Sequence, residues 1–333
     1  MEFTTGGRLT VRITPADVGK RVSVRRLTGS FDGTEKFTDT VGVLTSWDDN
    51  VVLITRRTGE TVRIAESSLV AGKVVPAAPA RRRGPAASFR ELARVAARAW
   101  QPVEREALGD WELRASGGFT RRANSVLPLG EPGMPLDDAL ARVRRWYDLR
   151  SLPVYIQTAT GAEGTQELLC AELEARGWRR EVTAELRVGA LAPLVDGGPD
   201  PDVAPVRLDR SFDEGWLRRY QRFDEPGPHV LRVLGGGPSV WFASVEGDDG
   251  VPAAIGRCVV DGRWAGFMAV EVDPARRRQG LASAVMRALA GRALEEGASA
   301  AWLQVESDNE AAGALYEGMG FATHHRYHHF RPA

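Results

Sequence analysis

The C-terminal part of the chain alternates short apolar runs with longer amphipathic segments. Strand-like runs include "SVWFASVE", "AAIGRCVVD", "WAGFMAVEV" and "AWLQVE", and helix-like segments include "LASAVMRALAGRALEEGA" and "NEAAGALYEGMG". A chain that alternates the period of a strand with the period of a helix favours an α/β sheet covered by helices. This fold class is therefore expected from about residue 204 to residue 333.

The segment from 88 to 203 shows the same order of elements. "SFRELARVAARAWQP", "DDALARVRRWYDLRSLP" and "TQELLCAELEARGW" have helical periodicity, and "VYIQTA" is typical of a buried strand. Aligning "VYIQTA…LLCAELEARGW" with "AWLQVE…AAGALYEGMGF" places Gln157 opposite Gln304 and Gly177 opposite Gly320. This internal similarity predicts that residues 88–203 and 204–333 are two copies of one fold.

Residues 1–75 show no helix-length period. Short β-branched runs such as "RVSVRRL" and "NVVLITRR" alternate with turn residues such as Asp48-Asp49-Asn50. This pattern favours a small all-β antiparallel barrel of about five strands, resembling an SH3-like barrel. Residues 76–87 are rich in Pro, Ala and Arg, and cannot form a core. They are expected to be a linker in which Arg81–Arg83 act as a solvated spacer.

The composition gives the chain no overall electrostatic preference. Lys plus Arg and Asp plus Glu both number 44, and residues 1–75 hold 11 basic and 9 acidic residues, which argues against nucleic acid as a partner. Cys170 and Cys258 stand alone and are expected to be buried, reduced thiols. No apolar run approaches ~20 residues, and the start lacks the pattern of a signal peptide. A cytoplasmic protein without a membrane span is expected.

A basic turn joins the strand "WAGFMAVEV" to the following helix. The first amide groups of a helix have no internal partner and the helix dipole adds positive potential, so a phosphate fits at such a junction. Glycine lets the backbone come close, and arginines add charge. The pattern predicts a phosphate-binding turn made of Arg277, Arg278, Gln279, Gly280, Leu281, Ala282 and Ser283. The first copy has "VLPLGEPGMPLDD" at this place, without a basic glycine turn.

Two motifs carry a resemblance to a known family. The turn Arg277-x-x-Gly280-x-Ala282 resembles the element with which the GNAT superfamily of N-acetyltransferases holds the pyrophosphate of acetyl-CoA. A second element of that superfamily is similar to "ESDNEAAGALYEGMGF", with Asn309, Tyr316, Gly320 and Phe321 in place. The two motifs stand in the expected strand-helix-strand-helix order.

The resemblance covers about 204–330 well and 88–200 in degenerate form. It implies a mixed, mostly antiparallel, splayed sheet flanked by helices, with a catalytic acetyl-CoA-binding half at 204–333 after a degenerate half at 88–203. It also implies acetyl-CoA as co-substrate, with no metal. The degenerate half is expected to bind no acyl-CoA and to form one wall of the acceptor site.

Roles in the catalytic half follow from the same resemblance. Main-chain groups of Val270 and Val272 would line the pantetheine arm. Asn309 would bond that arm, although a helix cap explains the residue equally well. Tyr316 would be the general acid that protonates the departing thiolate, although a buried aromatic residue also fits the pattern.

The general base is left open by the sequence. Superfamily members that act on histones carry a glutamate early on the strand before the phosphate turn, and the matching place here is near Gly266. Glu306 and Glu271 are therefore candidates, either directly or through a water molecule, against the alternative of ordinary surface charge.

The acceptor is expected to be a small amine. The order of a barrel followed by two such halves resembles an actinobacterial type of N-acetylglutamate synthase, which makes glutamate the first acceptor to try. The two carboxylates of glutamate would be bound by arginines such as Arg121, Arg122 or Arg257. Mycothiol synthase, which has tandem GNAT halves, is an alternative enzyme, and a non-catalytic acyl-CoA-binding or adaptor protein is an alternative of another class.

The C-terminal "HHRYHHF" contains four of the five histidines of the chain. Alternation along a strand places His324 and His328 on one face and His325 and His329 on the other. Two histidines per face, without an acidic or cysteine companion, make a poor metal site. A solvated or substrate-lining strand is the expectation.

Overall fold

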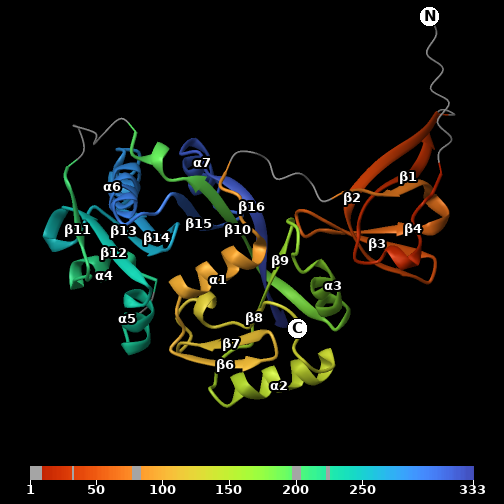
Figure 1. Ribbon diagram of the computed structural model, residues 1–333, viewed down its shortest axis with the longest axis horizontal. Coiled ribbons are helices and arrows are strands. Elements are labelled where there is room, and N and C mark those ends of the chain that lie inside the picture. The colour runs from red at the N-terminus through yellow and green to blue at the C-terminus, as the bar shows by residue number, and fades with distance from the viewer. Residues whose placement is uncertain (1–9, 32–33, 77–83, 197–203, 223–225) are drawn as a thin grey trace, which may run out of the picture. The chain divides into compact units, whose positions relative to one another are not determined.

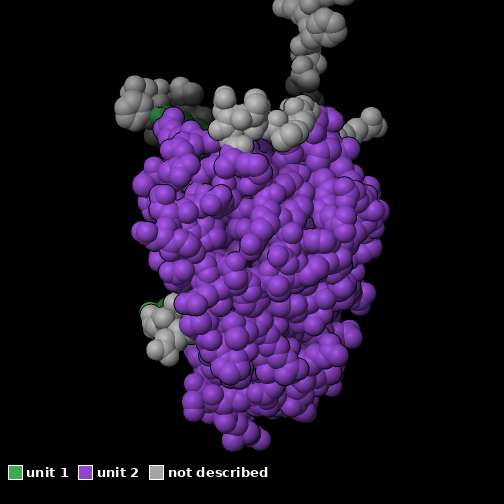
Figure 2. All heavy atoms as spheres, turned by 90° about the vertical axis from the view of Figure 1, so that its left-hand side faces the viewer, with its two compact units in different colours: residues 1–80, 158–179, 333 green, residues 81–157, 180–332 purple. Residues whose placement is uncertain are grey.

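The computed structural model describes residues 10–31, 34–76, 84–196, 204–222 and 226–333. It divides into two compact units, which are coloured separately in Figure 2. Unit 1 comprises residues 1–80, 158–179 and 333, and unit 2 comprises residues 81–157 and 180–332. Most of the expected linker, residues 77–83, lies outside the described residues.

Unit 1 contains a five-stranded antiparallel sheet in the order β4-β3-β2-β1-β5. The strands are β1 (Arg21–Phe31), β2 (Thr34–Asp48), β3 (Val51–Arg56), β4 (Thr61–Ala65) and β5 (Leu69–Val74). Asp49 and Asn50 adopt positive φ angles of 50° and 61° in the β2–β3 turn, as the hairpin turn between two twisted strands requires. Alternate apolar side chains of these strands form a closed core, in which Val22, Leu44, Val52, Ile54 and Ile64 are fully buried. The small all-β domain expected from the sequence is confirmed.

Helix α3 (Glu167–Ala175) belongs to unit 1, although the sequence grouped it with residues 88–203. Glu174 of this helix lies 3.5 Å from the Thr61 hydroxyl. Glu167 is buried and accepts hydrogen bonds from the Gly161 amide and the Thr165 hydroxyl, so it closes the loop that precedes the helix. The helix therefore packs with the barrel unit.

The larger sheet has eight strands in the order β11-β12-β13-β14-β15-β10-β16-β9 (Figure 1). Its strands are β9 (Ile156–Thr160), β10 (Trp178–Ala190), β11 (Val206–Asp209), β12 (Ser239–Val245), β13 (Ala254–Asp261), β14 (Trp264–Val272), β15 (Ala300–Glu306) and β16 (Ala322–Pro332). The assigned pairings among β10 to β15 are antiparallel except that of β14 with β15. A mixed, mostly antiparallel sheet is thereby confirmed.

A separate antiparallel sheet joins three short strands, β6 (Glu104–Leu108), β7 (Trp111–Ala115) and β8 (Leu127–Pro128). The remaining helices are α1 (Phe89–Ala99), α2 (Leu136–Asp148), α4 (Glu214–Tyr220), α5 (Pro228–Gly235), α6 (Leu281–Glu295) and α7 (Glu310–Gly318). None of the helices in the described parts of the chain is long and apolar enough to cross a membrane.

The two copies expected from the sequence share one sheet by exchanging their last strands. The order α2, β9, α3, β10 repeats as α6, β15, α7, β16, and Gly177 and Gly320 both have positive φ before the final strand. Yet β10 of the first copy lies between β15 and β16 of the second. It pairs with β15 from Ala184↔Glu306 to Ala190↔Ala300. The sheet of residues 204–333 is therefore completed by a strand from residues 88–203.

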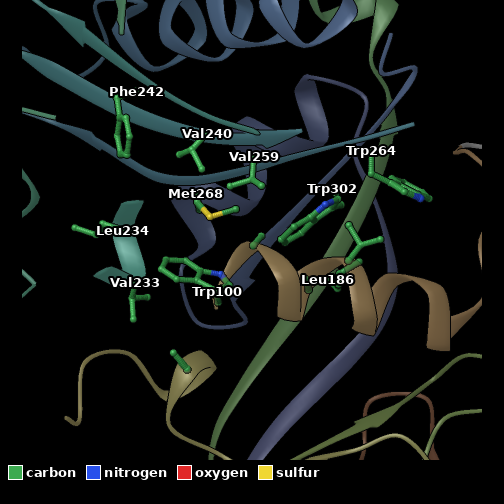
Figure 3. Close-up of a cluster of buried hydrophobic side chains, with 14 of the residues drawn as sticks. Trp100, Leu186, Val233, Leu234, Val240, Phe242, Val259, Trp264, Met268 and Trp302 are labelled. Carbon is green, nitrogen blue, oxygen red and sulfur yellow. The ribbon is translucent and has the colours of Figure 1, made fainter. Parts of the chain in front are cut away.

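Helices cover both faces of the β12–β15 region. On one face, α6 buries Leu281, Val285 and Leu289 in an apolar cluster with β13 to β15. On the other face, residues of α1, α4 and α5 pack around Trp302 and Met268, as Figure 3 shows from inside this cluster. These two layers fix the strands that carry the candidate site.

Strand β16 lies inside the sheet, which decides the environment of the C-terminal histidines. His325, His328 and His329 are 3%, 0% and 3% exposed. The expectation of a solvated strand is wrong for these three residues, because β16 has a strand on each side and both of its faces are covered. His328 bonds the Thr183 hydroxyl at 2.9 Å.

We expect the protein to lose stability as the pH falls from about 6.5 toward 3. Burial lowers the pKa of both His325 and His328 to about 3 from an ordinary value of 6.5. In that range the unfolded chain binds protons that the folded chain excludes, so the free energy of unfolding decreases by up to ~1.4 kcal/mol per pH unit for each histidine. This stabilisation is complete above pH 6.5.

Urea unfolding at pH 7.5, 6 and 5 measures this dependence. His328→Gln should reduce the slope, whereas His229→Gln, at an exposed position, should leave it unchanged. If the free energy of unfolding depends on pH equally steeply in His328→Gln and in wild type, buried His328 does not cause the dependence.

Candidate functional site

Strands β14 and β15 separate at one end. They pair in parallel only over Trp264–Phe267 and Ala300–Leu303, although β14 runs on to Val272 and β15 to Glu306. Their outer neighbours remain paired to these ends, at Ala254↔Val272 and Ala184↔Glu306. The splay therefore leaves main-chain hydrogen-bonding groups of both strands facing an opening in the sheet.

A β-bulge in β14 produces this separation. Ile255 faces Glu271 and Arg257 faces Met268, so Ala269 and Val270 together oppose Gly256. Ala269 has a φ of 53°, which is strained for a residue with a side chain and is typical of functional sites. A Cβ atom on Gly256 would lie 2.5 Å from Val285, so this glycine lets α6 approach the bulged strand.

The predicted pantetheine-lining residues lie on the bulged part of β14. The side chains of Val270 and Val272 are half-buried and pack against the cluster beneath α6. The main chain of the same residues lies beyond the last pair with β15. Both the core role and the position expected of a cofactor-lining strand are thus compatible with the structure.

The turn after β14 is held by Asp273. Its carboxylate accepts from the Ala275 amide at 2.8 Å and from Arg219 at 2.5 Å, and its amide bonds the Ala253 carbonyl at 2.8 Å. Further along, Arg278 and Gly280 have positive φ angles of 62° and 76°. Such left-handed residues turn successive backbone N–H groups toward one side, as in anion-binding nests.

Helix α6 begins directly after this turn and has no side-chain cap. Its N-cap residue is Gly280, and the first helical bond runs from the Ala284 amide to the Gly280 carbonyl at 3.0 Å. Within the described residues, the amides of Leu281, Ala282 and Ser283 therefore have no partner. By contrast, Asn309 caps α7 through a bond from the Ala312 amide.

The side chains around this helix start suit a phosphate. Arg277, Arg278 and Gln279 are exposed on the turn, and Arg276 bonds Gln279 at 2.9 Å. The first turn of α6 contains no acidic residue. The equivalent helix α2 has Pro135 as its N-cap and Asp137 and Asp138 in its first turn, and those charges disfavour an anion. The donors present in α6 therefore fit the pyrophosphate of a coenzyme A ester.

Tyr316 lies on the face of α7 that meets the same apolar cluster as Val270 and Val272. Its ring contacts Phe321 edge-on, with 6.1 Å between ring centroids. Burial raises the pKa of Tyr316 to about 12, and the nearby charge of Glu271 acts in the same direction. The phenol consequently keeps its proton at neutral pH, as a general acid must.

The two candidate bases lie at the splayed strand ends. Glu271 accepts two hydrogen bonds from Arg222, at 2.9 and 2.6 Å, and this arginine was not anticipated from the sequence. Glu306 is exposed at the end of β15, and its charge, with that of Glu271, acts on Arg222. The structure brings Glu271, Glu306 and Tyr316 into one region.

Gly266 lies opposite Trp302 in the parallel β14–β15 pair. A Cβ atom at Gly266 would lie 2.3 Å from the Trp302 ring, so the indole occupies the place of any side chain there. A glutamate at this position, as in the histone-acting members of the superfamily, is sterically excluded while Trp302 keeps its place.

Gly266→Ala should destabilise the protein by about 1–3 kcal/mol, because the added methyl group overpacks the Trp302 ring. Gly291→Ala in α6 is the matched control: its Cβ would make only an ordinary contact at 3.8 Å, and alanine favours a helix by up to ~1 kcal/mol over glycine. Urea unfolding of both variants measures the difference. Equal stability of both variants would show that β14 moves away from Trp302 without cost.

The three arginines predicted for acceptor binding have different surroundings. Arg257 is fully buried and donates to the carbonyls of Leu234, Ala99 and Gly236. These bonds tie the ends of α1 and α5 to β13, so a bound acceptor would have to compete with them. Arg121 and Arg122 lie in a 3-10 turn (Arg121–Ala123) within residues 88–203.

No group of three or more His, Cys, Asp or Glu side chains suitable for a metal occurs among the residues that the structure describes.

Comparison with known proteins decides the family. Residues 86–330 match the family model described as the probable histone acetyltransferase Rv0428c C-terminal domain. The chain is also 31% identical over 312 residues to the probable histone acetyltransferase Rv0428c of Mycobacterium tuberculosis, covering 92% of this chain and 93% of that protein. The chain belongs to the Rv0428c family of GNAT acetyltransferases.

The N-terminal sequence of this Rv0428c-family member matches a second model over residues 16–73, which is described as the Rv0428c N-terminal Sm-like domain. The small barrel is therefore assigned as Sm-like, although its strand pattern resembled that of an SH3-like barrel. Both descriptions denote a compact all-β domain, as observed in unit 1.

Solved structures show the GNAT fold for the rest of this Rv0428c-family member. A GCN5-related N-acetyltransferase from Kribbella flavida is 16% identical with a TM-score of 0.54, and the match covers 74% of this chain and 96% of that one. A tandem GNAT protein from the clavulanic acid biosynthesis pathway is 14% identical with a TM-score of 0.52, covering 74% and 89%. The tandem arrangement agrees with the two copies described above.

Proposed function

We propose that this enzyme transfers the acetyl group of acetyl-CoA to the amine of a small molecule, using one site in residues 204–333. The observation that carries the proposal is the uncapped start of α6 beside the splayed end of β14 and β15. A helix start with free amides suits the pyrophosphate, and the unpaired strand suits an extended amide-containing arm. Bound acetyl-CoA would supply the activated acyl group.

The residues of the chain would act around that acyl group as follows. Amides of Leu281, Ala282 and Ser283, with Arg277 and Arg278, hold the phosphates. Main-chain groups of Val270 and Val272 align the arm, and the Asn309 side chain, which caps α7, borders it. In this arrangement the thioester would lie at the open end of the splay.

Proton transfers complete the reaction. The attacking amine must be neutral, and Glu306 or Glu271 would accept its proton directly or through water. Tyr316 would donate its proton to the leaving thiolate. Arg222 would hold the Glu271 carboxylate in place by the two bonds described above.

The same reasoning gives each part of the chain a proposed role. Residues 204–333 would be catalytic, residues 88–203 would wall the acceptor site without binding acyl-CoA, and residues 1–75 would form a separate domain after which 76–87 act as a linker. The acidic first turn of α2 supports the absence of a second acyl-CoA site.

Calorimetry and an acceptor screen test this function. Acetyl-CoA should bind once per chain, and its consumption should require an amine from a panel of amino acids, amino sugars and polyamines, with glutamate first. The panel includes the mycothiol precursor amine, because tandem GNAT halves also occur in mycothiol synthase. Two acyl-CoA sites per chain would overturn the proposal.

A protein amine is the second candidate acceptor, because the relative from Mycobacterium tuberculosis is named a probable histone acetyltransferase. A lysine-rich histone-tail peptide therefore belongs in the same screen. Acetylation of that peptide in preference to every small amine would replace the small-molecule proposal with this one.

A further inference from the structure

A basic group of three arginines acts on His329 of β16: Arg114 is buried, Arg122 is half-buried and the Arg121 side chain is 39% exposed. His329 is 3% exposed, and neither of its ring nitrogens has a hydrogen-bond partner among the described residues. Burial and the charges of Arg122, Arg114 and Arg121 hold the pKa of His329 well below its ordinary value. The imidazole is therefore neutral and surrounded by three guanidinium groups.

These positive charges are only partly neutralised by the protein. Arg121 pairs with Glu181 at 2.5 Å, but Glu181 also pairs with Arg331 at 2.9 Å. In the part of the chain that the structure describes, neither Arg114 nor Arg122 has a carboxylate partner. Because Arg114 is buried and Arg122 half-buried without a carboxylate partner, an added anion would be favoured beside them.

Arg122 presents hydrogen-bond donors to such an anion. Its Nε donates to the Tyr327 hydroxyl at 2.9 Å, and its two terminal nitrogens make no bond to the described residues. Its guanidinium lies 5.9 Å from the ring of Trp100, whose indole N–H is buried and also has no partner among the described residues. Figure 3 shows Trp100 beyond the end of α1, near Met268. Free donors thus occur on two neighbouring residues.

The basic group adjoins the candidate catalytic carboxylates. Tyr220 contacts Phe119, next to the turn that carries Arg122, with 6.4 Å between ring centroids. The charges of Arg222, Arg122, Arg257 and Glu271 all act on this buried tyrosine. Tyr327, the partner of Arg122, is likewise within electrostatic reach of Glu306.

We propose that Arg122, supported by Arg114, Arg121 and His329, binds a carboxylate of the acceptor, so that the substrate is an amine that also carries negative charge. The amine then faces Glu271 and Glu306, and the carboxylate faces the arginines. The positive charges of the same arginines would repel a lysine-rich peptide. This inference rests on the proposed acetyl transfer, because KM can be measured only if the reaction occurs. Anion binding is the measurement that does not depend on the reaction.

Arg122→Gln should raise the KM for carboxylate-bearing amines by ~10- to ~100-fold, the loss expected for one charge-assisted contact. The KM for the corresponding methyl esters and the affinity for acetyl-CoA should change less than about twofold. Arg150→Gln is the matched control, since Arg150 contacts Trp146 and Glu104 at the surface of the degenerate half. L-Glutamate, L-aspartate and their dimethyl esters are the probes.

A binding measurement separates the two proposals. Glutarate, a dicarboxylate without an amine, should bind wild type and Arg150→Gln in calorimetry, and should bind Arg122→Gln at least ~10-fold more weakly. Arg122→Lys keeps the charge and should recover part of the affinity, which distinguishes loss of contact from loss of folding.

Glutarate binding without acetylation of any amine would support the anion site and refute the proposed function. Equal use of acids and esters, unchanged by Arg122→Gln, would overturn the anion site while leaving acetyl transfer intact. Binding of glutarate that Arg122→Gln leaves unchanged would show an adventitious anion only, and would also overturn it.

Discussion

Gly280→Asp should weaken acetyl-CoA binding by at least ~1000-fold, that is, by ~4 kcal/mol or more. The added carboxylate would stand at the positive end of α6, where the free amides of Leu281, Ala282 and Ser283 are expected to meet the pyrophosphate. Removing Arg277 or Arg278 singly should cost only ~10- to ~100-fold, because the main-chain donors remain. Calorimetric titration of acetyl-CoA at two salt concentrations compares the three variants.

Gly280→Asn is the control for shape. Asparagine has nearly the size of aspartate and also tolerates the left-handed backbone at φ 76°, but it carries no charge. Its loss of affinity should be clearly smaller than that of the aspartate variant. If Gly280→Asp binds acetyl-CoA like wild type, the phosphate site at α6 is wrong, and a plain basic surface would remain as the explanation of the arginines.

Tyr316→Phe should lower kcat by roughly 100-fold or more while leaving the affinity for acetyl-CoA nearly unchanged, since loss of a general acid costs ~10²–10⁴-fold. The phenylalanine ring keeps the edge contact with Phe321, so the fold should be preserved. Single-turnover acetylation with a rate-limiting chemical step is the required measurement.

The pH dependence of kcat provides an independent check on Tyr316. Because burial raises its pKa to about 12, the phenol stays protonated through the neutral and moderately alkaline range. Loss of the acid in Tyr316→Phe should therefore lower kcat at every pH up to about 10. The pH profile of the variant should show no additional decrease at alkaline pH. A variant as fast as wild type would remove Tyr316 from the mechanism.

The sequence predicted the elements whose local pattern agrees with their final environment. Strand β14, the glycine turn and α6 follow from apolar alternation, Gly280 and a helical period, and the structure has them as α6 (Leu281–Glu295) and β14 (Trp264–Val272). Strand β6 (Glu104–Leu108) was missed, because "EREAL" has a helix-forming composition and becomes a strand only through pairing with β7.

Parts of the site depend on contacts that no local pattern records. Arg222 follows α4 at the end of an expected helix, and its bond to Glu271 spans 49 residues. Arginine is usually exposed, so the full burial of Arg257 and its bonds to three helix-end carbonyls could not be read from its neighbours. The burial of His325 and His328 likewise depends on the strands beside β16.

The exchange of β10 and β16 bears on how the two copies can diverge. The proposed absence of a binding turn from "GEPGMPLDD" would leave the sheet intact, whereas removal of the whole first copy would take away β10, which pairs with β15 along its whole length. A separately expressed 204–333 fragment would leave β15 as an open edge prone to association with other chains. We therefore expect the fold to tolerate loss of the binding turn in one copy but not loss of its strand β10.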